Sequence, residues 1–166
     1  MDLRAHLLAA LDRAYELKSW HGPNLKGSLR GVSPAVAFFR PGPKRNSIYD
    51  LVLHTAYWKY VVKRRLAGQK RGSFALEGSN FFPAPLRPSA RALADAKSLL
   101  ESEHRALREV VEDLPEAAFR ARIGRWTSEA MISGVAAHDL YHAGQIQLLK
   151  KLWRGRGGSS SRAQRL

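Results

Sequence analysis

The chain has 166 residues, 45% of them hydrophobic, and it carries 28 lysines and arginines against 14 aspartates and glutamates, a formal net charge of +14. Its length predicts one domain, and its lack of cysteine excludes disulfides and thiolate metal sites, so a metal would be bound through nitrogen or oxygen. No segment approaches the roughly 20 apolar residues that cross a bilayer, so we expect no membrane partner.

The first predicted helix runs from Asp2 to about Trp20, and Gly22-Pro23 ends it. Its apolar residues recur at three- and four-residue steps, which is typical of an amphipathic helix: Leu3, Leu7, Leu11, Ala14 and Leu17. Charged residues interrupt these apolar positions, so the segment does not resemble a signal peptide, and we expect a cytoplasmic protein.

A long connection rich in glycine and proline follows, from residue 21 to about residue 46. Within it, Ser33 is expected to cap a short helical turn with Pro34 at its first position. Phe38 and Phe39 would pin this turn to the rest of the protein.

The second helix is predicted to begin at Ser47 and to stop at Gly68. Ser47 and Asp50 form a pair that resembles a capping box, and basic residues lie near the C-terminal end, where the helix dipole favours positive charge. One face of this helix carries Leu51, His54, Trp58 and Val61 or Val62. A second long connection covers residues 69–87.

The third helix is predicted from about Pro88 to Leu114, and Pro115 closes it. Leucines at seven-residue intervals indicate the seam of a bundle: Leu93, Leu100, Leu107 and Leu114. A turn and a loop follow, and then Thr127 or Ser128 caps a fourth helix that continues to about Trp153.

The pattern as a whole predicts an all-α four-helix bundle with two long connections. Residues 1–154 would form this domain. Residues 155–166 form a basic tail of glycine and serine composition without periodicity, so we expect this tail to be disordered.

The fourth helix contains two histidines, His138 and His142, that lie one turn apart on one face. The same stripe is otherwise mostly apolar, which points both rings toward the interior: Met131, Val135, Gln145, Leu149 and Leu152. Two imidazoles at this spacing could bind one metal ion, or they could be surface residues or hydrogen-bonded core residues. The metalloprotease motif is absent, because Asp139 stands in place of its glutamate and projects roughly 100° away from His138.

A third histidine, His54, lies on the predicted core face of the second helix. A catalytic zinc-type site uses three protein ligands and leaves a position open for water or substrate, so three histidines would suffice. The alternative is a core histidine bonded to a carbonyl or a tyrosine. His104, near the seam of the third helix, is a weaker candidate for a fourth ligand, and His6 and His21 are expected to face solvent.

Two segments together resemble the DinB-like (DinB/YfiT) superfamily: SIYDLVLHTAYW and, later in the chain, HDLYHAGQIQLLKKL. The sharpest match is Tyr141 to Ile146. The resemblance implies an up-down-down-up four-helix bundle with a divalent metal, often zinc or nickel, held by His54, His138 and His142. It also implies a homodimer, and in some relatives a reaction that uses a low-molecular-weight thiol.

Four neighbours of the histidines have candidate roles. Gln145 could hydrogen-bond a ligand ring or a neighbouring backbone group, and Trp58 could wall a pocket or belong to the core. Tyr141 could donate to a substrate oxyanion, although packing between helices is favoured. Gly144 could allow close helix packing or substrate approach, or could be a tolerated glycine.

These patterns leave three functional hypotheses. The first is a metal-dependent enzyme that activates water or a thiol for attack on a small electrophilic substrate, which the basic charge suggests is anionic. The second is a non-catalytic stress-response module that binds a metal or a ligand. The third is a nucleic-acid-associated protein, for which the residues to test are Lys59, Lys63, Arg64, Arg65 and the basic tail.

Overall fold

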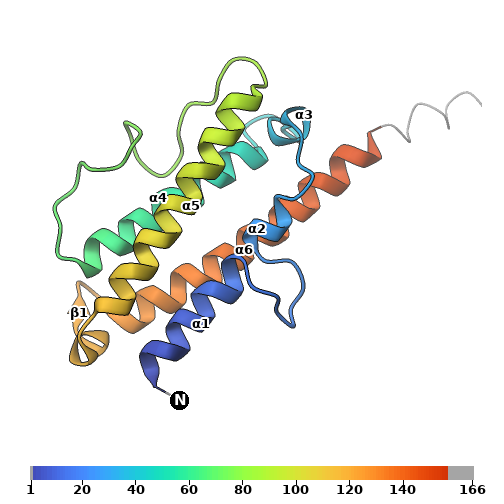
Figure 1. The fold of residues 1–166 in the computed structure, drawn as a ribbon. Helices are drawn as coiled ribbons and strands as arrows, with labels where there is room; N and C mark the ends of the chain where they lie inside the picture. Colours follow the sequence, from blue (N-terminus) through green and yellow to red (C-terminus); the bar gives the residue numbers. More distant parts are fainter. Residues whose placement is uncertain (1, 157–166) are drawn as a thin grey trace, which may run out of the picture.

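Four long helices account for most of the computed structural model, which describes residues 2–156 (Figure 1). They are α1 (Leu3–Tyr15), α4 (Ile48–Leu66), α5 (Ala90–Asp113) and α6 (Ser128–Gly155). The predicted all-α class is therefore confirmed. No helix among the described residues combines the length and the apolar character needed to cross a bilayer.

The segments between the long helices hold short elements. These are α2 (Leu25–Ser28), α3 (Pro34–Ala37), a 3-10 helix, η1 (Glu116–Arg120), and a hairpin of β1 (Arg122–Ile123) and β2 (Trp126–Thr127). The expected cap of α3 is present, since the Ser33 hydroxyl accepts from the backbone N–H of Val36. The loop expected after η1 is instead an antiparallel hairpin, because Gly124 adopts a φ of 66° that closes a tight turn.

The first helix ends at Tyr15, so its predicted extension to Trp20 was wrong. Asn24 caps α2 through its side-chain oxygen. Its side-chain nitrogen donates to the carbonyl of Leu17, so this carbonyl bonds to the residue before α2 and not to a further turn of α1. Leu17 is consequently 52% exposed rather than part of the core stripe.

Helix α4 is the central element, and its start follows from local chemistry. The Ser47 hydroxyl accepts from the backbone N–H of Asp50, and the Asp50 carboxylate accepts from the backbone N–H of Ser47, which is a complete capping box. Residues 48–56 are all buried, because α5 packs on one side of α4 and α6 on another. A side chain in this part of α4 therefore faces protein in almost every direction.

The predicted seam of α5 is confirmed. All four of its leucines are buried, and they divide between two clusters of core residues. One cluster contains Leu93, Leu100 and much of α4, and the other contains Leu107, Leu114 and the apolar residues of α1 and of the first half of α6. The histidines of α4 and α6 lie where these two clusters meet.

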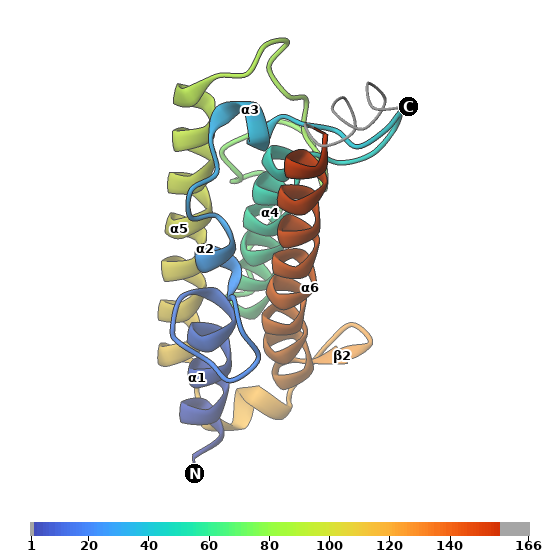
Figure 2. The ribbon, with the colours of Figure 1, turned by 90° about the vertical axis from the view of Figure 1, so that its right-hand side faces the viewer.

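Chain direction can be followed in Figure 2. Helices α4 and α5 both begin near α3, at the end of the molecule where α6 finishes, and α1 begins at the opposite end. Phe38 stacks on Tyr49 and Phe39 contacts Trp153, so these two residues fasten the connection before α4 as expected. The tail of residues 155–166 was predicted to be disordered. From residue 157 on, this tail lies outside the described part of the chain.

Candidate metal centre

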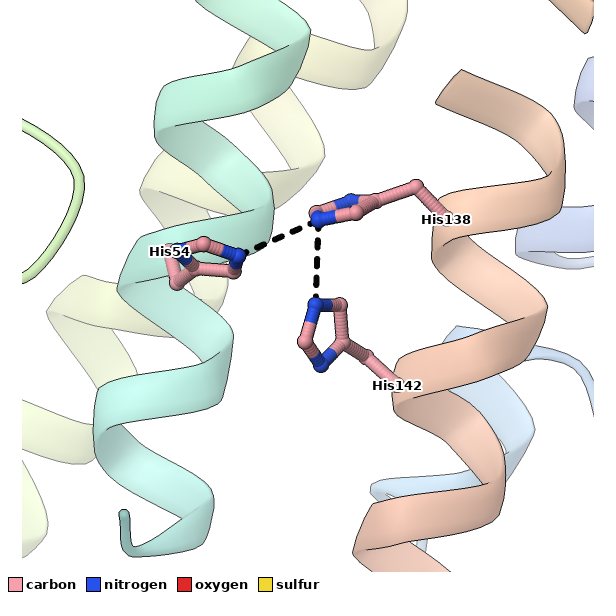
Figure 3. A group of neighbouring side chains, drawn as sticks. All are labelled: His54, His138 and His142. Atoms are coloured by element: carbon pink, nitrogen blue, oxygen red, sulfur yellow. Dashed lines mark hydrogen bonds between the residues drawn. The ribbon is translucent and has the colours of Figure 1, made fainter. Parts of the chain in front are cut away.

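The structure brings His54, His138 and His142 together between α4 and α6 (Figure 3). The Nε2 atom of His138 lies 3.1 Å from Nε2 of His54 and 3.0 Å from Nε2 of His142. The helical spacing of His138 and His142 places both rings on the face of α6 that looks toward α4. The three rings thus point the same kind of atom at one small volume.

Two of the three rings are oriented by hydrogen bonds on their outer side. Nδ1 of His54 donates to the backbone carbonyl of Asn80 at 3.0 Å, and Nδ1 of His142 donates to Oε1 of Gln145 at 2.7 Å. Because each of these neutral rings carries its proton on Nδ1, its Nε2 atom presents a lone pair to the centre. Of the two alternatives considered for Gln145, the bond to a histidine ring is the one present.

His138 cannot satisfy both of its neighbours by hydrogen bonding. A neutral imidazole has one N–H, so Nε2 of His138 can donate to His54 or to His142 but not to both. At least one contact then brings two nitrogens to about 3 Å without a hydrogen bond between them, and Nδ1 of His138, which is buried, has no hydrogen-bond partner in the described residues. A cation among the three Nε2 atoms removes this conflict, because it accepts a lone pair from each ring.

Burial keeps the rings neutral. It lowers the pKa of His138 to about 3, with a further contribution from the other two histidines, and it lowers the pKa of His142 to about 4. It also lowers the pKa of His54, which the bonds to Asn80 oppose. Neutral imidazoles are the form that binds metal, so the environment favours ligation over protonation.

The spacing of the nitrogens suits a transition-metal ion. Metal–nitrogen bonds of about 2.0–2.1 Å in a tetrahedral site place the ligand nitrogens roughly 3.3 Å apart. The observed contacts of 3.0 and 3.1 Å are shorter by only a few tenths of an ångström, which small rotations of the rings would supply. The three ligand atoms lie within 4.8 Å of one another, and the donor set, the two short spacings and the tautomers of His54 and His142 therefore fit one divalent cation.

Aromatic residues enclose the ring of His54. Phe81 stacks on it with ring centroids 4.4 Å apart, and Trp58 approaches it edge-on at 6.3 Å. The indole N–H of Trp58 donates to the side-chain oxygen of Asn80, so the residue that accepts from His54 also fixes Trp58. Asn80 and Phe81 were not identified from the sequence, because loop residues show no periodicity. The one signal was the pair Phe81-Phe82 within a polar connection.

Two neighbours of the histidines on α6, Tyr141 and Gly144, are exposed. Tyr141 is 65% exposed and touches the edge of His142, so the favoured prediction that it packs between helices was wrong. Gly144 is also exposed, and a Cβ there would meet no atom within 4 Å, so close helix packing does not explain this glycine. Both residues lie on the solvent-facing side of α6, whose other side stays buried at Ala143 and Ile146.

His104 lies apart from the three histidines and does not join them as a fourth ligand. Its ring stacks on Tyr15 with centroids 3.9 Å apart, and its Nδ1 accepts from Lys59 at 3.3 Å. Burial and the nearby Lys59 lower the pKa of His104 to about 3, so it accepts this bond as a neutral ring. As expected, His6 and His21 are exposed.

Lys59 and Asp139 form an ion pair in which both side chains are fully buried. Lys59 was expected among basic surface residues, and this was wrong, because its position on α4 faces both α5 and α6. Asp139 directly follows His138, and its second carboxylate oxygen has no hydrogen-bond partner in the described residues. The pair joins the two helices that carry the histidines.

Two cavities adjoin the centre. The larger, of about 820 Å³, lies between α4 and residues 71–80; Trp58 and Asn80 line it, but none of the three histidines does. The smaller, of about 310 Å³, lies between α4 and α6, and His138 is part of its wall. The smaller cavity therefore has direct access to a ligand ring.

These features define a class of protein: an all-α fold in which two helices hold three histidines that could bind one divalent cation. The chain belongs to the DinB superfamily, whose family model matches residues 19–146 and so includes all three histidines. This confirms the resemblance noted in the sequence. No match was found among curated proteins or among solved structures.

Proposed function

We propose that the protein is a metal-dependent enzyme in which His54, His138 and His142 bind one divalent cation, with zinc or nickel as the best candidates. The strongest support is the convergence of three Nε2 atoms, two of them on rings whose outer nitrogens are already hydrogen-bonded. A cation held there would supply a Lewis acid that lets a water or a thiol lose its proton near neutral pH. Three neutral ligands leave the full charge of the cation available for this purpose.

The chain's own residues orient the ligands and restrict access to them. Asn80 and Gln145 keep two rings in the tautomer that ligation needs, and Phe81 and Trp58 limit the contact of His54 with water. Asp139 does not act as a base at the centre, because its carboxylate is buried against Lys59. The activated water or low-molecular-weight thiol would attack a small electrophilic substrate, as in a thiol transferase or a hydrolase.

Metal analysis of protein prepared without an affinity tag tests this proposal. We expect about one equivalent of a transition metal per chain, or its uptake on incubation with zinc or nickel, together with a higher melting temperature. His138→Ala should lose the metal and the thermal shift, and His6→Ala, which replaces an exposed histidine on α1, should keep both. Protein that carries no metal and gains none would refute the proposal.

A non-catalytic metal-binding module is the alternative. It would be favoured by a fourth protein ligand that closes the coordination sphere, and His104 was the candidate for that position. In the described residues His104 instead bonds Lys59, and the group of residues able to share one ion consists of three histidines. This arrangement supports the enzyme over the module.

The evidence for a nucleic-acid surface is weaker. Lys59 is buried, and Lys63 is paired with Glu103 at 2.6 Å, so two of the four residues proposed for such a surface have partners within the protein. A steep salt dependence of nucleic-acid binding would be needed to revive this hypothesis. We instead connect the net charge to an anionic substrate.

Three further proposals concern topology, location and assembly. We propose an up-down-down-up order for α1, α4, α5 and α6, which the chain directions in Figure 2 support, and we propose a cytoplasmic protein. We also propose a homodimer, supported by large side chains that α6 exposes at seven- and four-residue steps: Tyr141, Leu148 and Leu152. Light scattering of Leu148→Glu against the unmodified protein tests the dimer.

A further inference from the structure

The smaller cavity is a groove between α4 and α6 with the composition of a binding site. Three valines and Met131 line part of it, and Trp58 and Trp126 contribute two indoles. Arg65 carries a positive charge, and His138 presents a neutral ring. Its volume of about 310 Å³ lies at the lower end of the range of small-molecule pockets, which are mainly apolar with a few polar groups. The groove therefore suits a small molecule with an apolar body.

A glycine creates space in this groove next to the metal centre. Gly134 lies one turn before His138 on the same face of α6, and both line the groove. A Cβ at Gly134 would meet no atom within 4 Å, and the backbone there does not require glycine. Glycine inside a helix costs about 1 kcal/mol relative to alanine, so neither packing nor helix stability accounts for it. Its effect is to leave room beside a ligand ring.

Arg65 gives the groove a positive charge that no acidic residue neutralises. Its neighbours have partners within the protein: Lys63 pairs with Glu103, and Arg64 donates to the carbonyl of Gln69. Within residues 2–156, the Arg65 guanidinium has no hydrogen-bond or ion-pair partner. A guanidinium in an apolar groove binds a carboxylate or phosphate more strongly than it does at an open surface.

The geometry of α4 sets the distance between the charge of Arg65 and the metal centre at His54. Arg65 follows His54 by three turns, which at 1.5 Å per residue is about 16 Å along the helix axis. An arginine side chain is too short to span this distance. A molecule that reached both the centre and Arg65 would need a body of several bonds between its reactive atom and its anionic group.

We propose that the groove binds a small substrate with an apolar chain or ring and a distant anionic group, with Gly134 admitting the apolar body and Arg65 facing the anion. The reactive end lies at the side of His138. This assignment rests on the proposed function and specifies the substrate class of the same site.

Hydroxamic acids of different length test the groove on zinc-loaded protein by calorimetry. Acetohydroxamate probes the metal alone, hexanohydroxamate adds a chain, and the monohydroxamate of suberic acid adds a carboxylate at the far end. Each methylene that becomes buried should strengthen binding about fourfold. The terminal carboxylate should strengthen binding further relative to its methyl ester, and Arg65→Gln should remove that difference.

Gly134→Leu should fill the groove and weaken hexanohydroxamate at least tenfold, while acetohydroxamate binds unchanged. Gly144→Leu is the matched control, because Gly144 is an exposed glycine of the same helix that does not line this groove and likewise has no atom within 4 Å of an added Cβ. Melting temperatures establish that both variants fold, and Gly134→Ala serves as a milder change.

Two results would overturn the inference: equal affinity for the short and long hydroxamates, or equal loss of both in Gly134→Leu. Failure of the proposed function looks different, because zinc and acetohydroxamate would then not bind at all. In that case, hexanoate titrated into metal-free protein and followed by tryptophan fluorescence, to which the two groove tryptophans contribute, decides whether the groove binds apolar anions by itself. Hexanoate binding that Gly134→Leu abolishes would support the groove, and no binding would overturn it.

Discussion

Replacing Lys59 by methionine should destabilise the protein far more than a typical lysine substitution. Lys59 and Asp139 are fully buried, and Lys59 is the only cation that pairs with Asp139 within residues 2–156, so Lys59→Met leaves a carboxylate uncompensated in the interior. Breaking a buried ion pair in this way costs about 3–5 kcal/mol at neutral pH. For a chain of this size, that corresponds to a fall in melting temperature of roughly 10 °C or more.

The matched control is Lys26→Met. Lys26 also forms ion pairs, with Glu16 and Glu101, but its side chain is 44% exposed. Exposed pairs contribute about 1 kcal/mol or less, so this variant should unfold close to the unmodified protein. Both variants are compared by urea unfolding at pH 7, and the slope of the transition shows whether a difference reflects stability alone.

The defect of Lys59→Met should depend on pH with a definite sign. Burial raises the pKa of Asp139, so without Lys59 the folded state favours the protonated acid. A carboxyl whose folded pKa is raised adds stability below its unfolded pKa of about 3.9 and loses it as the pH rises. The deficit should therefore be small near pH 4 and grow toward neutral pH.

A double variant separates loss of the pair from loss of packing. Lys59→Met combined with Asp139→Leu removes both charges, and replacement of a buried pair by apolar residues is often neutral or stabilising. Most of the lost stability should therefore return. Equal stability of Lys59→Met and Lys26→Met at pH 7, or a double variant less stable than the single one, would refute this reasoning.

Four other predictions concern the histidines and the start of α4. Burial lowers the pKa of all three histidines, that of His138 to about 3 and that of His142 to about 4, so zinc affinity should start to fall only well below pH 6.5, and a decline that begins near pH 6.5 would contradict this. The same shifts mean that the unfolded state binds more protons, so metal-free protein should lose stability as the pH falls below about 6.5, as measured by thermal unfolding. Gln145→Leu removes the acceptor of the His142 ring and should weaken zinc binding about 10- to 100-fold in a competition titration, whereas Gln147→Leu should not. Ser47→Ala breaks the capping box and should cost about 1 kcal/mol in urea unfolding without changing zinc affinity.

Features that depend on neighbours in the sequence could be predicted well. The capping box at Ser47 needs only a hydroxyl and a carboxylate three residues apart, and the leucine seam of α5 needs only a seven-residue repeat. The pairing of His138 with His142 follows from the pitch of one helix. The addition of His54 depended on the family resemblance as well as on its place in an apolar stripe.

Features that depend on contacts across the fold could not be predicted in this way. Lys59 was expected at the surface because a lysine near other basic residues is normally solvated. Its buried partner, Asp139, is on a different helix, and only the packing of α4 against α6 brings the two together. The same limit applies to Asn80, whose carbonyl meets His54 because of the path of a long loop, and to Gly134, whose significance depends on what faces it across the groove.

Asn80 links the loop after α4 to the metal centre, and its backbone has a φ of 65°, which asparagine tolerates better than most residues. A cation bound to Nε2 of His54 would make its Nδ1–H a stronger donor, and so would strengthen the hydrogen bond to the Asn80 carbonyl. Thermodynamic coupling is reciprocal: if a bound cation stabilises the ordered loop by some factor, then ordering of the loop raises the affinity for the cation by that same factor. Hydrogen exchange of the loop amides should then be slower when the metal centre is occupied, so exchange rates would report metal binding without any knowledge of the substrate.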